Sequence, residues 1–340
     1  MKHNILLLML FASSLHGLTV KTVTVKATGG SYTSLAAAVA GEYAANPNLV
    51  TADIQLNIEL FYLGAADVGP VAFLSTWVTD STHYVNVYVA PGNGHSGVWG
   101  SSAYNLTSLA AGLDIETAYV RVTGVQINSS GATVLMTNVN PAASHIVLDQ
   151  LILRCSTGSG CGYGVAFESG NSVLRNSVIL GAAASGGTGV ELTYANYPAT
   201  VTLENCTVSG FTTGVANAYG TLTVKNTYSG GNSSTDYSAP TGGGTTSYTT
   251  SASSDATSRT GVTPSVAYST SAGGYFTNVT AGSENLNIGA SSALKAAGTS
   301  LAGEFTTDIT GATRSGTWDI GAFMYQVAAT ATRKRVSVIQ

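Results

Sequence analysis

Two glutamates at matching places in neighbouring repeats are the residues best suited to chemistry. Glu168 follows the segment Gly164-Val165-Ala166-Phe167, and Glu191 lies inside the matching segment Gly189-Val190-Glu191-Leu192. If the large apolar residues of each segment point inward, both glutamates point outward as diagonal neighbours. Two carboxylates can act as general acid and general base. The next repeat, which begins at Gly214, has only alanine at these places, so the sequence offers no carboxylate triad.

A second strand-like run in each repeat carries charges of alternating sign. Asp149, Arg175, Glu204 and Lys225 occupy equivalent outward positions, and each stands directly before a Gln or an Asn. Opposite charges on adjacent strands stabilise a sheet by cross-strand pairing. We therefore interpret this column as a structural salt-bridge ladder rather than an active site.

Aromatic side chains supply the candidates for sugar binding, because an exposed ring offers a flat apolar face with a polar edge. They occur in the irregular region 64–106 and in the long loop after residue 192: Trp77, Trp99, Tyr104, Tyr194 and Tyr197. The alternative for each is packing in the core or under a cap.

The elements that position these residues are short strands in a repeat. Each repeat holds two alternating runs, and the second run carries an Asn at the same place three times, at Asn176, Asn205 and Asn226. A fixed period of this kind predicts a solenoid. Asn tolerates the left-handed backbone of a tight bend, and stacked amides can hydrogen-bond from coil to coil. We therefore assign these three residues a structural role.

The N-terminal part predicts a leader, a strand and a helix. Residues 1–17 have one positive charge, an apolar run and small residues, as in a secretory signal peptide, the alternative being an apolar first strand. Residues 18–63 are expected to form a strand and then a helix over 31–43 with Thr33 or Ser34 as N-cap. Because a solenoid needs its first open coil covered, we interpret this helix as a cap.

The remaining chain is expected to form the solenoid (64–325) and a tail (326–340). Its Ser/Thr/Gly-rich part, 230–274, fits either loosely ordered coils or a disordered linker. Residues 276–325 are expected to cap the end of the solenoid. Within them Arg314 lies near two carboxylates in sequence, so we expect a structural ion pair with Asp308 and Asp319.

Composition excludes several classes of protein. Only 9% of the 340 residues are charged and 40 are Gly, which fits many short strands and turns rather than a helical bundle. A net charge of −4 argues against nucleic acid as a partner but leaves neutral or basic glycans open. Cys155 and Cys161 flank a loop that can close as a disulfide ring, and Cys206 is expected to be a buried thiol. The five histidines have no metal-ligand spacing, so no metal site is predicted.

These features resemble the right-handed parallel β-helix proteins of the pectate-lyase-like superfamily. The two-strand coils, the Asn turns and the Tyr32-Thr33-Ser34-Leu35 helix entry carry the resemblance, together with the ending Asp308-Ile309-Thr310-Gly311 and Asp319-Ile320-Gly321-Ala322. The stretch from Thr79 to Tyr104 is similar to uncharacterised phage and prophage β-helix proteins. The resemblance implies an all-β, single-stranded right-handed parallel β-helix with a short N-terminal capping helix. It implies little about activity, because the superfamily includes lyases, hydrolases, tailspikes and adhesins.

We therefore expect an exported or virion-associated scaffold or adhesin, extracellular or at the cell surface, that contacts a polysaccharide or cell-surface glycan without catalysis. A homotrimer is one possible assembly, and neither nucleic-acid binding nor membrane insertion is expected. The alternative is a polysaccharide lyase or glycoside hydrolase. Under that alternative the catalytic candidates are Glu168, Glu191 and Arg175. For a lyase the resemblance implies a basic residue that abstracts a proton and Ca²⁺ as the cofactor, and for a hydrolase it implies a cluster of Asp or Glu. No cofactor is otherwise expected.

Overall fold

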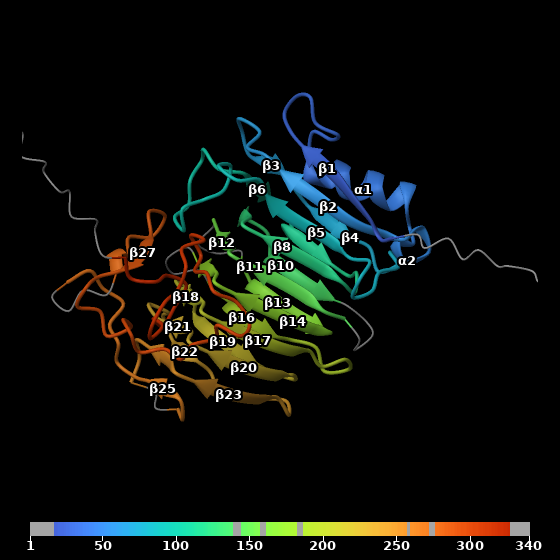
Figure 1. Cartoon of the computed structure of the whole chain (residues 1–340). Coiled ribbons are helices and arrows are strands. Elements are labelled where there is room, and N and C mark those ends of the chain that lie inside the picture. The colour runs from blue at the N-terminus through green and yellow to red at the C-terminus, as the bar shows by residue number, and fades with distance from the viewer. Residues whose placement is uncertain are drawn as a thin grey trace, which may run out of the picture.

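The alternating segments form three parallel sheets that wind around one core, and Figure 1 shows them stacked from β1 to β23. The computed structural model describes residues 17–138, 144–156, 161–181, 186–256, 259–271 and 276–326. The expected parallel β-helix is confirmed. The predicted signal peptide (1–17) and tail (326–340) lie outside the described residues, apart from Gly17 and Gln326.

Sheet A has nine strands in chain order: β1 (Thr19–Val25), β2 (Ile54–Leu60), β5 (Val85–Val89), β8 (Val120–Thr123), β11 (Ile146–Asp149), β14 (Asn171–Arg175), β17 (Thr200–Glu204), β20 (Thr221–Lys225) and β23 (Thr245–Thr249). Sheet B has seven: β4 (Val71–Phe73), β7 (Leu113–Ile115), β10 (Thr133–Asn138), β13 (Tyr163–Ser169), β16 (Thr188–Leu192), β19 (Thr213–Asn217) and β22 (Thr235–Tyr237). Sheet C has nine: β3 (Asp67–Val68), β6 (Asn105–Ser108), β9 (Gln126–Ser129), β12 (Ile152–Cys155), β15 (Val178–Leu180), β18 (Thr207–Ser209), β21 (Tyr228–Ser229), β24 (Ser251–Ser253) and β25 (Val262–Thr263).

Each regular coil has three strands, not the two that the sequence pattern predicted. A coil passes from sheet B to sheet A and then to sheet C, as in β13, β14 and β15. The second alternating run of each repeat splits at its Asn, because that residue adopts a left-handed backbone, with φ of 47° at Asn176, 49° at Asn205 and 47° at Asn226. One left-handed residue turns the chain sharply enough to move the next strand into another sheet.

The core is built from side chains that stack in register along the solenoid. On sheet B, Leu113, Leu135, Val165, Val190 and Val215 lie on successive rungs, and none is more than 1% exposed. Burying one such side chain stabilises the fold by about 1.5–3 kcal/mol. Because every coil repeats the pattern, the coils hold one another in a single register.

The stacked asparagines lie at the corner between sheets A and C and are fully buried. The amides of Asn205 and Asn226 contact at 3.1 Å, as expected for a coil-to-coil ladder. Asn176 instead donates from Nδ2 to Asp149 Oδ1 at 3.0 Å. Gln150 and Thr250 continue the left-handed corner, with φ of 56° and 47°.

The N-terminal helix forms as the capping signals predict. Helix α1 (Leu35–Ala45) begins after Ser34, whose side chain accepts a hydrogen bond from the Ala37 N–H at 3.1 Å. Its buried face includes Leu35, Ala38 and Val39, which join the solenoid core. A short second helix, α2 (Leu49–Ala52), leads into β2. No described helix is both long and apolar enough to cross a membrane.

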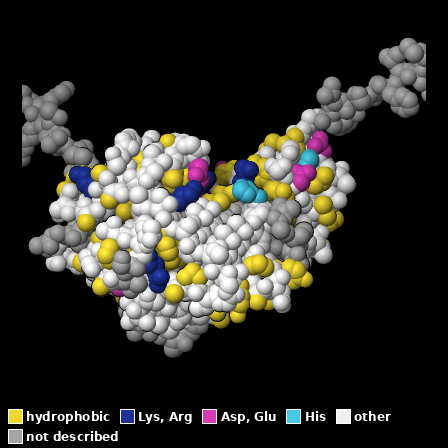
Figure 2. Space-filling view, turned by 90° about the horizontal axis from the view of Figure 1, so that it is seen from below, with side chains coloured by type: hydrophobic (Ala, Val, Ile, Leu, Met, Phe, Trp, Pro, Cys, Tyr) yellow, Lys and Arg dark blue, Asp and Glu magenta, His cyan; other side chains and the backbone are white. Residues whose placement is uncertain are grey.

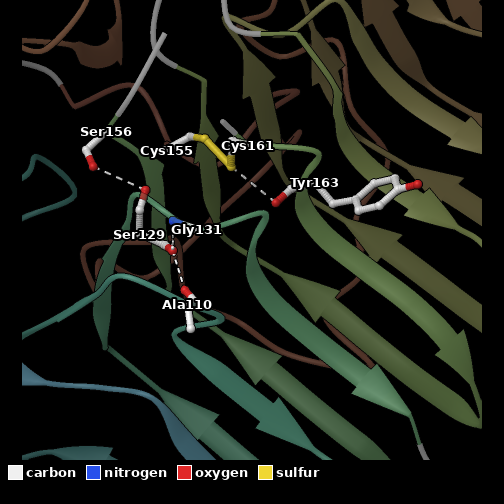
Figure 3. The surroundings of a disulfide bond; sticks show 7 residues. All are labelled: Ala110, Ser129, Gly131, Cys155, Ser156, Cys161 and Tyr163. Carbon is white, nitrogen blue, oxygen red and sulfur yellow. Dashed lines mark hydrogen bonds between the residues drawn. A yellow bond between two sulfur atoms is a disulfide. The ribbon is translucent and has the colours of Figure 1, made fainter. Parts of the chain in front are cut away.

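The Ser/Thr/Gly-rich part is not a linker where the structure describes it, since β22, β23, β24 and β25 continue the three sheets. Cys155 and Cys161 are joined by a disulfide between the end of β12 and the start of β13 (Figure 3). Cys206 is a buried free thiol, as expected, and burial raises its pKa.

Residues 276–326, which include the hairpin β26 (Phe276–Asn278) and β27 (Asn285–Ile288), form what we call the C-terminal strap. We expected a terminal cap, but the strap lies along the flank of the solenoid. Gln150 Nε2 donates to Asp308 O at 2.7 Å, and Asn226 Nδ2 donates to Thr299 O at 2.6 Å. The physical reason is that the outward side chains of sheet C are apolar and pack against apolar side chains of the strap. They are Ile152, Val178, Leu180 and Tyr228 on sheet C, and Phe276, Leu294, Ile309, Ile320 and Phe323 in the strap.

The expected ion pair of Arg314 is not formed. Arg314 is 4% exposed and donates to the carbonyls of Gly321 and Ala322 at 3.1 and 2.9 Å. No contact within 4.0 Å joins it to either carboxylate among the residues that the structure describes. Asp308 and Asp319 instead accept hydrogen bonds from backbone N–H groups of the strap. The strap is irregular and forms few backbone–backbone hydrogen bonds of a β-sheet, so its N–H groups need such side-chain partners. Burial lowers the pKa of Arg314 to about 10, and the two nearby carboxylates oppose that shift.

Candidate functional site

The outer face of sheet B brings the two predicted glutamates into one surface. Glu191 pairs in register with Ala166 on one side and Ala216 on the other, as the repeat predicted. The same column continues through Met136 to Asp114, which lies on β7 between the buried residues of that strand. Asp114 and Glu191 therefore project from the same face, three rungs or about 14 Å apart.

Glu168 lies in a β-bulge. Thr137 pairs with Phe167, but Asn138 pairs with Ser169, so Glu168 is an extra residue with no partner on β10. A bulge bends its strand and re-aims the side chain at that point. Glu116 follows β7 at the same end of the sheet, two rungs or about 10 Å from Glu168.

The carboxylates of this face have no cation to balance them. Within the described residues no Lys, Arg or His lies within 4.0 Å of Asp114, Glu116, Glu168 or Glu191. Burial, followed by the charges of Glu116 and Glu168, raises the pKa of Asp114 to about 6. Its Oδ1 is buried and has no hydrogen-bond partner. Burial also raises the pKa of Glu168 and of Glu191, the latter opposed by a hydrogen bond from Thr188.

Two of the five aromatic candidates are exposed beside this face. Tyr194 and Tyr197 are 42% and 53% exposed, and their rings stack with centroids 6.2 Å apart at 18°. Their loop leaves β16 beside Glu168, because the Thr193 N–H donates to Phe167 O at 3.1 Å. Tyr219, which is 39% exposed, occupies the corresponding turn of the next coil.

The other three aromatic candidates serve the fold. Trp77 is 2% exposed and donates from Nε1 to Asn46 O at 3.0 Å. Tyr104 is 1% exposed and its hydroxyl donates to Asp67 Oδ2 at 2.6 Å. Trp99 packs on the cluster beneath the C-terminal strap, with the Arg154 guanidinium 5.8 Å from its ring centre. A sequence cannot distinguish such rings from exposed ones when the surrounding coils are irregular.

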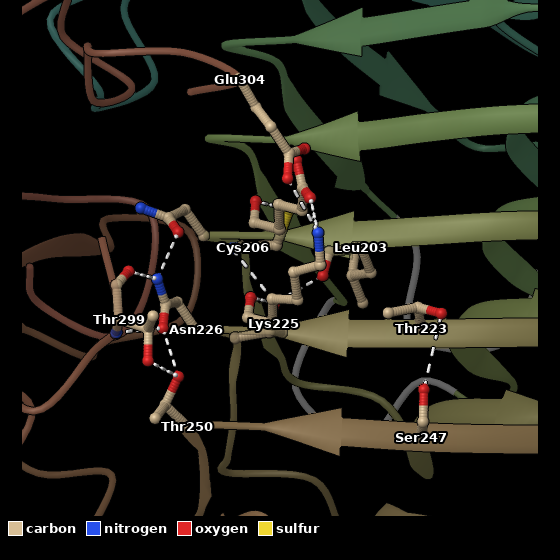
Figure 4. A network of polar contacts seen from close by, with 12 residues as sticks. Leu203, Cys206, Thr223, Lys225, Asn226, Ser247, Thr250, Thr299 and Glu304 are labelled. Carbon is tan, nitrogen blue, oxygen red and sulfur yellow. Dashed lines mark hydrogen bonds and ion pairs between the residues drawn. The ribbon is translucent and has the colours of Figure 1, made fainter. Parts of the chain in front are cut away.

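Arg175 does not join the glutamates. It projects from sheet A, pairs with Asp149 at 2.8 Å and lies over the Phe305 ring at 5.0 Å. The predicted column is in register from Asp149 through Arg175 and Glu204 to Lys225. Figure 4 shows its far end, where Lys225 reaches Glu304 of the strap at 3.0 Å as well as Glu204 at 2.9 Å. The charged residues of this column therefore stabilise the fold by pairing with one another and with the strap.

Sequence reasoning missed Asp114 and Glu116. Both lie in the alternating segment Leu113-Asp114-Ile115-Glu116, but this segment precedes the regular repeats and could not be aligned to them. Within that segment the alternation of apolar and acidic residues points both acids outward, and this was the signal that could have identified them. Figure 2 shows one face of the molecule, on which charged side chains form only a few small groups on a mostly uncharged surface.

The residues present do not fit a Ca²⁺ site of the lyase kind. Such a site needs six or more oxygen ligands that converge on the ion. No group of three His, Cys, Asp or Glu is placed to hold a metal ion in the described ranges of the chain. We therefore derive no calcium-dependent step from this face.

Comparison with known proteins does not identify a family for this chain. No family model matches the sequence, and no curated protein matches it. Among solved structures the chain is similar to a crystal structure of pectate lyase Pel9A, with a TM-score of 0.42 and 12% identity, over 91% of this chain and 98% of that one. A likeness this weak carries no inference about substrate or activity.

Proposed function

We propose that this chain is an exported β-helix scaffold or adhesin that contacts a glycan through the outer face of sheet B. The observation that supports this is the exposed Tyr194–Tyr197 pair next to carboxylates without cations. Tyrosine rings can stack on the C–H face of a sugar, and carboxylates accept hydrogen bonds from its hydroxyls. Because the charged side chains of this face that the structure describes are all acidic, neutral or basic sugars fit it better than acidic ones.

The cellular setting belongs to the same proposal. We place the protein outside the cell or at its surface, with a virion as the alternative setting. N-terminal sequencing of the mature protein distinguishes these, since cleavage near residue 17 supports export and an intact Met1 on purified virions contradicts it. Light scattering of the purified protein tests whether it forms the homotrimer.

Glycan binding can be tested by affinity electrophoresis through gels that contain neutral, basic or acidic polysaccharides. We expect the wild-type protein to be retarded by a neutral or basic polysaccharide, and the Tyr194→Ala/Tyr197→Ala variant to bind at least about ten-fold more weakly. Tyr88→Ala, which removes an outward tyrosine of sheet A, is the matched control and should bind normally. Equal losses in both variants would count against a site on sheet B.

A second candidate, a glycoside hydrolase, is favoured by one observation. A carboxyl group whose pKa is near 6, as at Asp114, is still partly protonated near neutral pH and can act as a general acid. Glu116 and Glu168 lie on the same face as possible bases, and inverting enzymes separate their two carboxyls by about 6.5–9.5 Å.

Turnover separates the two candidates. Reducing sugars and unsaturated products would be measured on the same polysaccharides, with and without Ca²⁺. We expect binding without product for the scaffold. Reducing-sugar release that is lost in Asp114→Asn and Glu168→Gln, but not in Glu304→Gln, would establish the hydrolase instead.

A further inference from the structure

A small pocket on sheet A is lined by Ser81, Tyr84, Tyr119, Arg121 and His145, with a volume of about 120 Å³. Tyr84, Tyr119 and His145 stand directly before β5, β8 and β11, so they stack on successive rungs of one outward column. Arg121 projects from the neighbouring column two residues after Tyr119. Three consecutive coils thus contribute to one hollow.

Arg121 is a cation without a carboxylate. Its guanidinium lies 4.0 Å from the centre of the Tyr84 ring, and Nη1 donates to the Tyr84 hydroxyl at 3.2 Å. In register its neighbours are Asn86 and Val147, both neutral. No ion pair to Arg121 exists in the part of the chain that the structure describes, whereas Arg175, two strands further along sheet A on β14, is paired with Asp149. A guanidinium has five N–H donors, so most of those on Arg121 remain available.

Asp80, which directly precedes Ser81 of the pocket, is already engaged. His83 lies between Asp53 and Asp80, with its Nε2 3.1 Å from Asp53 Oδ1 and its Nδ1 2.9 Å from Asp80 Oδ1. Those hydrogen bonds raise the pKa of His83, the largest cause being Asp53. The His83 imidazole therefore hydrogen-bonds both carboxylates, while the residues that line the pocket are neutral or basic.

We propose that this pocket binds a single oxyanion group, a carboxylate, sulfate or phosphate, through the Arg121 guanidinium. Stacking on Tyr84 fixes the plane of the guanidinium, and a planar fork of N–H donors matches two oxygens of such a group. The Tyr119 and Ser81 hydroxyls and the His145 ring are the remaining polar groups of the pocket. Its volume suits one small group, since sites for drug-sized ligands occupy about 300–1,000 Å³. This inference does not depend on the glycan site of sheet B, which lies on a different sheet and favours the opposite charge.

The test is isothermal titration calorimetry at low ionic strength with inorganic sulfate, inorganic phosphate, glucuronate, glucose 6-sulfate and, as a neutral probe, glucose. We expect saturable binding of at least one anion and none of glucose. Tighter binding of the sugar-borne groups identifies a glycan source for the anion, and tighter binding of the inorganic ions identifies a free ion. In Arg121→Gln the affinity should fall at least about ten-fold, since a charge-assisted bond is lost.

The matched control is Arg154→Gln, which makes the same change of net charge on sheet C and should bind normally. Equal losses in the two variants would mean a diffuse charge effect and overturn the proposal, as would the absence of saturable anion binding by the wild-type protein. If circular dichroism shows that Arg121→Gln is unfolded, Arg121→Lys replaces it. Lysine keeps the charge but not the fork, so binding should fall several-fold, and unchanged binding would contradict the fork geometry.

Discussion

Sheets A and B carry charge on the outside of the same coils, but in opposite ways. On sheet A the column Asp149, Arg175, Glu204 and Lys225 alternates in sign, and ion pairs of 2.8 and 2.9 Å join its members. On sheet B the charges are all negative, and no cation pairs with them among the described residues. A column that alternates in sign satisfies its own charges, whereas a column of one sign leaves them available to a ligand.

The two sheets also differ in what surrounds their buried carboxyl groups, Glu204 on sheet A and Asp114 on sheet B. Glu204 is fully buried, and although burial raises its pKa, Lys225 opposes that shift directly. Asp114 has only burial and like charges around it, all of which raise its pKa. Groups with shifts that no partner opposes are more common at functional sites than in structural networks. Stability should therefore depend on sheet A, and ligand contact on sheet B.

The largest effect on stability should come from Lys225→Met. This change leaves Glu204, whose side chain is 0% exposed and whose Oε2 already lacks a partner, without its cation. We expect a loss of about 2–3 kcal/mol in the free energy of unfolding, somewhat below the usual cost because Lys225 is partly exposed. Urea unfolding measures it. The double variant Lys225→Met/Glu204→Gln should recover at least half of the loss, and a single variant as stable as wild type would show that the ladder contributes nothing.

An intermediate effect is expected from Asp114→Asn, through its dependence on pH. The pKa of Asp114 is raised in the folded protein, so its proton stabilises the fold fully below the ordinary value of 3.8 and less as pH rises through about 6. Relative to Asp114→Asn, the wild-type protein should therefore gain about 1 kcal/mol between pH 7.5 and 4.5, a figure reduced for the half-exposed position. Urea unfolding at both pH values measures this gain. A wild-type protein that loses stability relative to the variant on acidification would mean that a cation pairs with Asp114.

The smallest effect should come from Glu191→Gln. This glutamate has no ion-pair partner in the described structure, and burial disfavours its charge, so its removal should change the free energy of unfolding by less than about 0.5 kcal/mol at pH 7. Thermal unfolding followed by circular dichroism is sufficient to measure it. A loss comparable to that of Lys225→Met would remove the distinction between the two sheets.

Much of the fold could be predicted because each coil repeats the same physical solution. The matching segments at Gly164, Gly189 and Gly214 gave the register of sheet B, and Asn176, Asn205 and Asn226 marked the corner between sheets A and C. The third strand of each coil was missed because the run passes through the corner without a Gly or a Pro, although the corner shifts the inward residues by one place, from Leu203 before it to Cys206 and Val208 after it.

The strap-covered face of sheet C and the carboxylate face of sheet B were harder to predict, because both depend on contacts that lie outside the repeat. Apolar Ile152, Val178 and Leu180 face outward and require the C-terminal strap, but in sequence they look like core residues. Consecutive apolar residues such as Leu151-Ile152-Leu153 are the signal for a sheet covered on both faces. Asp114 joins Glu168 only through the strand order of sheet B, which no local pattern contains.

The most direct test of this account is a glycan-binding comparison between the two sheets in one experiment. Wild-type protein, Tyr194→Ala/Tyr197→Ala on the sheet B side and Thr223→Ala on the outer face of sheet A would be compared on the same polysaccharide panel. The account predicts binding of a neutral or basic glycan that falls at least about ten-fold in the tyrosine variant and is unchanged in Thr223→Ala. Binding lost in the sheet A variant and kept in the tyrosine variant would contradict it.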